Sequence, residues 1–265
     1  MNAKPSISLI FVNYRSARYL SAALESLFSF EREADSFEII VVNNDPAESA
    51  AVQTLQQTFS FQFIESGENR GFSRGNNLGA KQALGAILGF INPDVLWTGP
   101  YLRKIAQVFD KNTRIGVLGM ALLDTEKRSE AWSYGKEPSL VTLFFNNLFP
   151  AQCDARLERE AFFPDWVSGG ALFVRAELFA EIGGFDEQFF LYFEDVDLCK
   201  EARQRGFLVM GYPEFSLIHL GGKSRESRRL QKKHYALSQR KYFRKHRPRW
   251  EGRILESLQF IFRKM

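Results

Sequence analysis

Four nearly continuous apolar runs in the first 95 residues constrain the fold more than any other feature of the sequence. They read ISLIFVNY (7–14), FEIIVVNN (37–44), FQFI (61–64) and AILGFINPDV (86–95). Runs that do not alternate with polar residues are typical of strands buried on both faces of a parallel sheet. Joined by short helical segments, they predict an open, mostly parallel α/β sheet with helices on both faces.

The segments between these runs have helical spacing. The first predicted helix follows Ser16, a residue type that often caps helix N-termini, and the second includes Val52 and Phe59. The stretch ENRGFSRGNN (68–77) is rich in Gly and Asn, and we expect a loop there. Helical spacing resumes at Ala80, so the third helix is predicted from that residue onward.

Polar residues stand where the predicted strands end. Asn13 closes the first strand, the turn Asn43–Asp45 closes the second, and Asn92-Pro93-Asp94 interrupts the fourth apolar run. Ligands of doubly wound sheets bind outside the carboxyl ends of the strands, where such residues meet. We therefore expect these three groups to converge on one site.

The second half of the chain predicts further elements of the same kind. Helices are expected at 100–110, 176–182 and 195–205, and strands at 115–123, 168–175, 207–212 and 216–220. Residues 124–165 fit no single pattern. They contain an apolar patch, LVTLFFNNLFP (140–150), for which two interpretations stay open: a loop that faces an acceptor, and plain packing beneath an insertion.

Charge is distributed unevenly along the chain. Residues 224–265 hold 14 Lys and Arg against 3 Asp and Glu, a net of +11, while the other 223 residues hold 21 against 28, a net of −7. This basic segment predicts helices broken near Pro248, with Ile254 and Leu258 on one apolar face. Basic amphipathic helices commonly lie in a membrane interface, although docking on the domain is the alternative interpretation. No zinc spacing or RNA-binding motif supports nucleic acid.

Several familiar classes are excluded. The turn after the first strand, VNYRSARYL, has neither GxGxxG nor a P-loop, and no GxSxG elbow occurs. The two cysteines, Cys153 and Cys199, lie outside any metal or redox spacing, which favours a reduced, cytoplasmic compartment. No run of about 18 apolar residues predicts a membrane-spanning helix.

The remaining candidates for chemistry are acids and one histidine. Asp94, at a strand end, suits a hard divalent cation. Glu194, Asp195 and Asp197 lie at a predicted helix start, where a general base and simple partners of the helix dipole are both reasonable interpretations. His219 lies near the end of a predicted apolar strand (216–220), so it is either a metal ligand or a satisfied core residue.

The order of the motifs VNY, VVNN, NRGFSRGNNLG, INPDV, WVSGGALFVR, GGFDEQFFLYFEDVDLC and IHLGG resembles the family-2 glycosyltransferases. The similarity covers about residues 5–250 and is strongest to the bacterial rhamnosyltransferase-like branch that builds O-antigen, capsule or other envelope polysaccharides. It implies a GT-A fold, a nucleotide-sugar donor, a divalent cation (Mg²⁺ or Mn²⁺) and inversion at the anomeric carbon. The implied organisation is a catalytic domain over 1–223, divided into a nucleotide-sugar half (1–123) and an acceptor half (124–223), followed by the tail 224–265.

The resemblance also implies roles for individual residues. Asp94 matches the last acid of the family's metal-binding DxD-type motif, and His219 matches a position that helps hold the metal or the diphosphate. Asp195 matches the catalytic base, and Glu194 is the second implied catalytic residue, which orients Asp195 or contacts the acceptor, while Asp197 supports the helix. The implied donor-binding residues are Asn13, Tyr14, Asn43, Asp45, Asn69, Arg70, Gly71, Phe72, Asn76, Asn77, Asp94, Gly169 and Gly170. The family usually has Asp at position 43, so Asn43 removes a charge from the predicted base contact.

The best single prediction for the donor is dTDP-L-rhamnose, with UDP-hexoses or UDP-N-acetylhexosamines as the alternative. The predicted acceptor is a lipid-linked glycan at the inner face of the cell membrane, where the basic tail would hold the enzyme as a peripheral protein. Two other classes are alternatives: a non-catalytic nucleotide-sugar or glycan-binding assembly subunit, and a nucleotidyltransferase. The retained acids oppose the first, and the absence of a Gly-rich turn after the first strand opposes the second.

Overall fold

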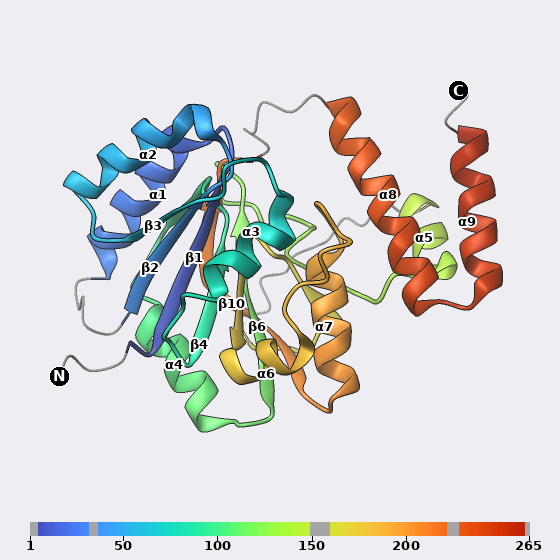
Figure 1. The fold of residues 1–265 in the computed structure, drawn as a ribbon. Helices are drawn as coiled ribbons and strands as arrows, with labels where there is room; N and C mark the ends of the chain where they lie inside the picture. The colour runs from blue at the N-terminus through green and yellow to red at the C-terminus, as the bar shows by residue number, and fades with distance from the viewer. Residues whose placement is uncertain (1–4, 32–36, 149–159, 222–227, 263–265) are drawn as a thin grey trace.

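The computed structural model describes residues 5–31, 37–148, 160–221 and 228–262. Its centre is an eight-stranded sheet with the order β3-β2-β1-β4-β9-β6-β10-β5 (Figure 1). The strands, in that order, are Gln62–Glu65, Phe37–Asn43, Ile7–Asn13, Ile87–Ile91, Ala171–Arg175, Ile115–Leu123, Leu208–His219 and Val95–Trp97. A second sheet pairs β7 (Tyr134–Gly135) with β8 (Trp166–Val167).

The predicted parallel sheet is confirmed for the first four strands. β1 pairs in parallel with both β2 and β4, and β2 pairs in parallel with β3. β9 then enters antiparallel between β4 and β6, and β10 runs parallel to β6. The two strands predicted at 207–212 and 216–220 are one strand, β10, whose register shifts between Tyr212 and Ser216. The run predicted as one strand over 86–95 ends at Ile91, and Val95 begins β5 on the opposite edge.

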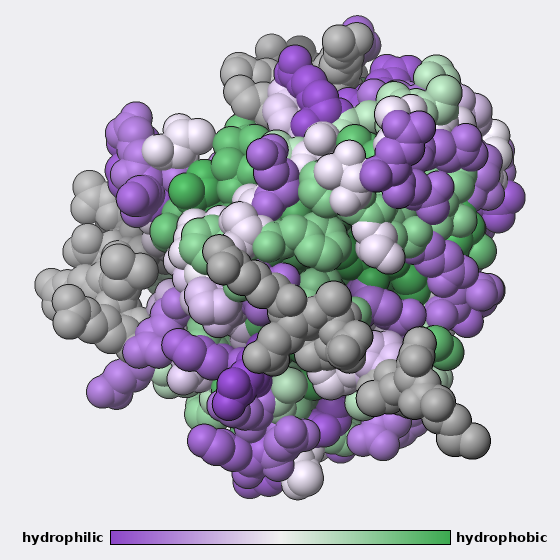
Figure 2. Space-filling model, turned by 90° about the vertical axis from the view of Figure 1, so that its left-hand side faces the viewer, coloured by the Kyte–Doolittle hydropathy of each residue, from purple (hydrophilic) through white to green (hydrophobic). Residues whose placement is uncertain are grey.

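Two apolar layers cover the faces of the sheet. One face packs against α1 (Ala17–Phe30), α2 (Ser49–Thr54) and α4 (Leu102–Lys111), and a 3₁₀ turn (Leu55–Gln57) follows α2. The other face packs against α3 (Gly71–Ala80), α6 (Ala176–Ile182) and α7 (Glu194–Gln204). Figure 2 views the molecule from the side on which α2 lies in Figure 1. On that side, hydrophilic residues surround an apolar area. These buried faces supply most of the driving force for folding.

The loop predicted at 68–77 is wrong, because α3 begins at Gly71 and ends at Ala80, where the third helix was expected to start. Its glycines let the helix lie directly on the sheet. A Cβ at Gly75 would stand 2.8 Å from Val12 Cγ1, and one at Gly79 would stand 2.6 Å from Ile10 Cγ2. Close packing therefore outweighs the poor helix propensity of Gly and Asn.

Hydrogen bonds join α3 to the segment that leads into α7. Phe72 N donates to Phe190 O at 2.8 Å, and Ser73 Oγ donates to Phe189 O at 2.5 Å. The Asn77 side chain donates to Phe185 O at 2.8 Å and accepts from Phe185 N at 2.9 Å. Helix α3 is thereby fastened to the segment that precedes α7.

Ser16 occupies the N-cap position of α1, but its side chain does not cap the helix. Its hydroxyl donates to Asn13 Oδ1 at 2.9 Å. Glu48, on the 3₁₀ turn Pro46–Glu48, replaces it: Oε2 accepts from Ser16 N at 2.8 Å and from Ala17 N at 3.1 Å. A carboxylate at a helix N-terminus is stabilised by the helix dipole.

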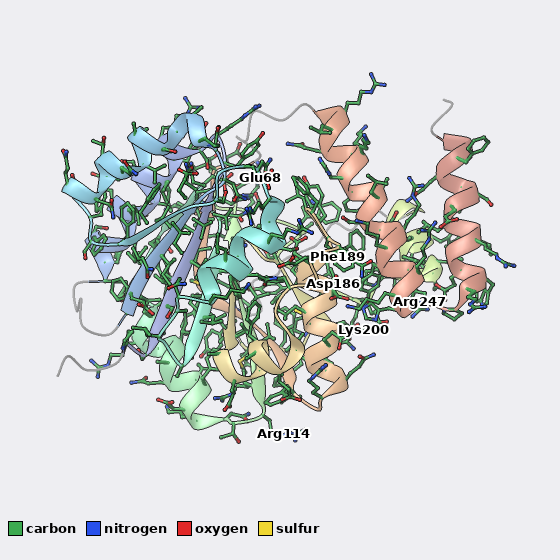
Figure 3. The ribbon with its side chains drawn as sticks, viewed as in Figure 1. Glu68, Arg114, Asp186, Phe189, Lys200 and Arg247 are labelled. Carbon is green, nitrogen blue, oxygen red and sulfur yellow. The ribbon has the colours of Figure 1, made fainter. Side chains whose placement is uncertain are left out.

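The basic tail forms α8 (Arg228–His246) and α9 (Arg249–Phe262), which gather with α5 (Leu140–Leu148) beyond α7 (Figure 1). Tyr242, Phe243 and Leu255 are buried in a third apolar cluster with Phe189 and Val196. Figure 3 shows Phe189, Asp186 and Lys200 in the region between the sheet and the tail helices, and Arg247 at the junction of α8 and α9. At least part of the tail is therefore docked on the domain.

Asp197 of α7 makes the polar link to α8. His246 Nε2 lies 2.5 Å and Lys245 Nζ 2.9 Å from its Oδ1, and the Asp197 side chain is only 3% exposed. Asp197, Glu201 and His246 lie close enough to share a metal ion, but the Lys245 ammonium already supplies a cation there. Cys199 is a buried free thiol, and Cys153 lies outside the described residues.

Candidate active site

A cleft of about 340 Å³ opens at the carboxyl ends of the parallel strands. Its walls come from both halves of the sheet and from α8. The lining residues are Val12, Tyr14, Ser16, Tyr19, Asn44, Asn69, Gly71, Phe72, Asn92, Pro93, Asp94, Phe190, Leu191, Tyr192, His219 and Gln231. Of the site residues predicted from the sequence, Tyr14, Asn69, Gly71, Phe72, Asp94 and His219 thus share one cavity.

Asp94 and His219 meet at one end of this cleft. The antiparallel pairing of β5 with β10 sets Val95 opposite His219, and Leu220 N donates to Asp94 O at 2.9 Å. His219 Nε2 then lies 3.4 Å from Asp94 Oδ1, and its Nδ1 lies 2.9 Å from Glu130 Oε2. Burial alone would lower the pKa of His219, but hydrogen bonds and charges from Asp94 and Glu130 raise it to about 10.

These donors fit a divalent cation. Carboxylate oxygens and an imidazole nitrogen suit Mn²⁺ and Mg²⁺, and Asp94 with His219 directs one of each kind to the cleft. Glu130 contacts the ring nitrogen on the other side. A carboxylate in that position holds the Nδ1 proton, and a metal ion at Nε2 would replace the second proton that the ring carries in the metal-free protein.

We expect Glu130→Gln to weaken Mn²⁺ binding about 10- to 100-fold, the usual effect of losing such an orienting carboxylate. Mn²⁺ titration followed by electron paramagnetic resonance measures this without any turnover. The matched control is Glu126→Gln, because Glu126 is exposed and pairs with Arg128 instead. Equal Mn²⁺ affinity in the two variants would remove the orienting role of Glu130.

Asp195 and Glu194 lie at the first turn of α7, after Tyr192 and Phe193, which both have a φ of 69°. This left-handed turn is costly for aromatic residues, so the packing around it must hold it in place. Asp195 Oδ2 accepts from Gly169 N and its Oδ1 from Val196 N, each at 2.8 Å. The backbone therefore fixes the orientation of the carboxylate.

Burial raises the pKa of both carboxyl groups. The pKa of Glu194 lies well above its ordinary value because the side chain is buried and Asp195 carries a like charge beside it. The pKa of Asp195 is raised by burial, against which the bonds from Gly169 and Val196 act. Carboxyl groups with raised pKa values are suited to proton transfer.

Asp195 is partly exposed close to the cleft, although it is not one of the residues that line it. A Cβ at Gly169 would lie 3.2 Å from the Phe72 ring and 3.5 Å from Asp195 Cβ, and Phe72 lines the cleft. The backbone of Gly170 accepts from Asn92 N at 3.0 Å. The glycine pair thus lies between Asp195 and the Asn92–Asp94 turn.

The residues predicted to contact the nucleobase are largely engaged with one another. Asn13 Nδ2 donates to Asn43 Oδ1 at 2.8 Å, and Asn43 Nδ2 donates to Glu65 Oε2 at 2.9 Å. Asp45 accepts from Ala47 N at 3.1 Å and caps the 3₁₀ turn. Asn44 lines the cleft, and its Oδ1 has no hydrogen-bond partner among the described residues.

Part of the predicted donor-side loop borders the cleft, and the rest faces the interior of the protein. Asn69 Oδ1 accepts from Gly71 N at 3.0 Å, and Arg70 extends toward Glu68 at 3.7 Å. Gly71 has a φ of +78°, and a Cβ there would collide with Phe190 O, so only glycine fits. Asn76 and Asn77 face the interior, where Asn76 Nδ2 donates to Phe72 O at 3.0 Å.

Sequence reasoning missed Glu130 and the contribution of α8, whereas Asn44 belongs to the predicted turn Asn43–Asp45. Gln231 of α8 lines the cleft, and Asp195 acts electrostatically on Tyr235, whose pKa is raised by burial and by that charge. Glu130 lies in a segment without periodicity, so no signal pointed to it. The tail was interpreted as a separate extension because its charge differs from that of the body.

The sequence matches the family model "Glycosyl transferase family 2" over residues 8–166. Among curated relatives, the N-acetylglucosaminyl-diphospho-decaprenol L-rhamnosyltransferase of Mycobacterium tuberculosis is 26% identical over 236 residues, which cover 80% of this chain and 75% of the relative. Rhamnosyltransferase WbbL of Escherichia coli is 24% identical over 225 residues, covering 80% of this chain and 83% of that protein.

Solved structures show the same fold. The mannosyltransferase PcManGT of Pyrobaculum calidifontis, in complex with GDP-Man and Mn²⁺, superposes with a TM-score of 0.64 at 18% identity, covering 97% of this chain and 70% of that chain. Residues 1–349 of Staphylococcus aureus TarS, in complex with UDP, superpose with a TM-score of 0.59 at 16% identity, covering 89% and 71%. At these identities the likeness establishes the architecture alone.

Proposed function

Because this chain belongs to glycosyltransferase family 2, we propose that it transfers L-rhamnose from dTDP-L-rhamnose, with inversion, onto a lipid-linked cell-envelope glycan. The observation that carries the proposal is the cleft at the carboxyl ends of the strands, which joins Asp94 and His219 at one end. The names of two relatives support the choice of rhamnose, and one name includes a diphospho-decaprenol.

In this mechanism the residues of the cleft hold the donor and Asp195 moves a proton. Asp195 accepts the proton of the acceptor hydroxyl as the hydroxyl oxygen attacks the anomeric carbon. The bond from that carbon to the diphosphate breaks on the opposite face, so the configuration inverts. Asp94 and His219 would hold the divalent cation, which would neutralise the charge that develops on the diphosphate.

The donor is positioned by the walls of the cleft. Tyr14 and Asn44 are the proposed contacts of the nucleobase, since the Asn43 oxygen already accepts from Asn13. Arg70, 45% exposed beside the cleft residues Asn69 and Gly71, is the proposed contact of the diphosphate. The proposed contacts of the acceptor are the remaining cleft residues Phe190, Tyr192 and Gln231.

A donor panel tests the proposal. With Mn²⁺ present, dTDP-L-rhamnose should raise the melting temperature of the protein and be hydrolysed slowly, while UDP-glucose and UDP-N-acetylglucosamine should do neither. The comparison is matched because all three donors carry a diphosphate. A thermal shift with a UDP-sugar alone would replace rhamnosyl transfer by the hexosyl alternative. No shift with any sugar nucleotide would favour the non-catalytic class.

The lipid-linked acceptor requires the protein to work at a membrane surface. Among the described residues, no helix is both long and apolar enough to cross a bilayer. The tail, with its net charge of +11 over 224–265, is the proposed electrostatic contact with anionic headgroups on the inner face of the membrane. The catalytic halves 1–123 and 124–223 and this tail are then one functional unit.

A further inference from the structure

Helices α5 and α9 each expose a row of large apolar side chains. On α5, Val141 is 64% and Phe144 is 61% exposed, three residues apart on one face. On α9, Trp250, Ile254 and Leu258 are 59%, 44% and 42% exposed at intervals of four residues. Side chains at these intervals stand above one another on a helix, so each helix presents a continuous apolar row.

These two apolar rows are the outer faces of helices whose inner faces are buried. Leu140 and Leu143 of α5 pack against the cluster that contains Leu255, which is 5% exposed. Leu140 N donates to Glu251 Oε2 at 3.2 Å, so the two helices are also joined by a hydrogen bond. The exposed rows are therefore held in place by packing on the opposite side of each helix.

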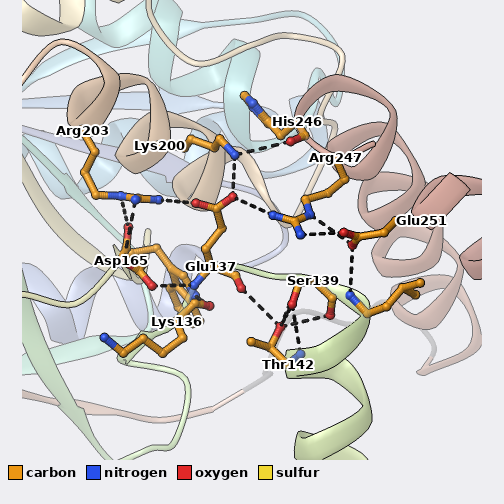
Figure 4. Close-up of polar contacts among 12 residues, drawn as sticks. Lys136, Glu137, Ser139, Thr142, Asp165, Lys200, Arg203, His246, Arg247 and Glu251 are labelled. Carbon is orange, nitrogen blue, oxygen red and sulfur yellow. Dashed lines mark hydrogen bonds and ion pairs between the residues drawn. The ribbon is translucent and has the colours of Figure 1, made fainter. Parts of the chain in front are cut away.

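An ionic network fixes this arrangement to the catalytic half (Figure 4). Glu137, just before α5, contacts Lys200 at 2.5 Å and Arg203 at 2.9 Å, both on α7. Arg247 lies 3.4 Å from Glu137 and 2.6 Å from Glu251. Any surface that binds the two rows is thus connected to the helix that carries Asp195.

Cations border the α9 row. Arg249 and Arg253 are exposed, four residues apart, and each directly precedes a member of the row, Trp250 or Ile254. A row of arginines beside a row of Trp, Ile and Leu is the pattern of a helix lying in a membrane interface, where the cations meet anionic headgroups. This charge complementarity favours a lipid surface over a second copy of the chain, whose apolar patch would bring the same cations together.

We propose that α5 and α9 insert their two apolar rows into the interface of an anionic bilayer. The inference rests on the proposed function only for its biological setting, a lipid-linked acceptor. It goes beyond an electrostatic tail in two respects: α5, which belongs to the catalytic half, takes part, and binding persists in salt because apolar burial is not screened.

Flotation with vesicles of phosphatidylglycerol and phosphatidylethanolamine tests the inference. We expect Val141→Ser/Phe144→Ser and Ile254→Ser/Leu258→Ser each to reduce vesicle binding at least about tenfold, because each removes burial of two apolar side chains. The matched control, Leu84→Ser, alters a side chain that is 57% exposed between α3 and β4, and it should bind like the wild type. Surface substitutions are preferable to truncation here, since Leu255 and Glu251 are buried.

Three results would overturn the inference. The first is undiminished vesicle binding in both double variants. The second is a loss of wild-type vesicle binding in 0.5 M salt to the level of the variants. The third is a wild-type dimer in light scattering that becomes a monomer in the double variants. Transfer to a soluble acceptor separates this inference from the proposed function. Both double variants should retain that activity, whereas a wrong donor or reaction would abolish it in the wild type and leave vesicle binding intact.

Discussion

Asp195→Asn should lower kcat by about 10³-fold while leaving the affinity for the donor unchanged, since a general base typically contributes 10²–10⁴-fold. The amide can still accept from Gly169 N, so the local geometry is largely kept, but it cannot take a proton. Asp195 does not line the cleft, which is why donor binding should persist. Single-turnover transfer and a thermal shift with the donor measure the two quantities separately.

The same substitution two residues on is the control. Asp197 binds Lys245 and His246 and has no contact with the cleft, so Asp197→Asn should lower the melting temperature while kcat largely survives. If both variants lost kcat equally, Asp195 would be supporting the helix instead of acting as a base. In the wild type, burial raises the pKa of Asp195, and only the deprotonated carboxylate can act as the base. As the pH is lowered, kcat should therefore begin to fall at a higher pH than it would with an exposed aspartate.

Asp94→Asn should abolish tight Mn²⁺ binding and lower kcat at least about 10²-fold, because a metal ion supplies several kcal/mol of stabilisation to the charge that develops in the transition state. Asp94 is the carboxylate that lies beside His219 in the cleft. Electron paramagnetic resonance of Mn²⁺ gives the binding result without turnover, and initial rates give the other.

Asp124→Asn is the control for this loss of charge. Asp124 directly follows β6, whose last residue pairs with Ile218, but its carboxylate forms an ion pair with Arg128 at 2.7 Å and does not line the cleft. Its variant should bind Mn²⁺ as the wild type does. Unchanged Mn²⁺ affinity in Asp94→Asn would transfer the metal site elsewhere, and unchanged rates in the absence of any divalent cation would remove the metal from the reaction.

The parallel half of the fold could be predicted because burial on both faces leaves a direct trace in sequence. The runs at 7–14 and 37–44 are apolar throughout, and they became β1 and β2 with nearly the predicted bounds. Helix α3 could not be predicted in the same way. Its glycines are required because the helix packs directly against Val12 and Ile10. A local propensity scale contains no information about such contacts.

The candidate site, like the fold, was predictable in part. Asp94 and His219 each end or follow an apolar run, so their place at the sheet's carboxyl edge was readable, and the structure brings them together. Glu130 reaches His219 from an irregular segment, and Gln231 reaches the cleft from a helix more than a hundred residues after Asn69. Contacts of this kind depend on the closed fold and leave no periodic pattern.

The fastening of α3 to the segment 185–190 has a consequence for anyone who recombines this enzyme with its relatives. A chimera joined near residue 123 would take α3 from one parent and its partner segment from the other. The buried Asn77 would then face a foreign backbone, and its amide would lose both bonds to Phe185. Unsatisfied buried amides are costly, so exchange of acceptor preference should succeed only when 71–80 and 185–190 are inherited as a pair.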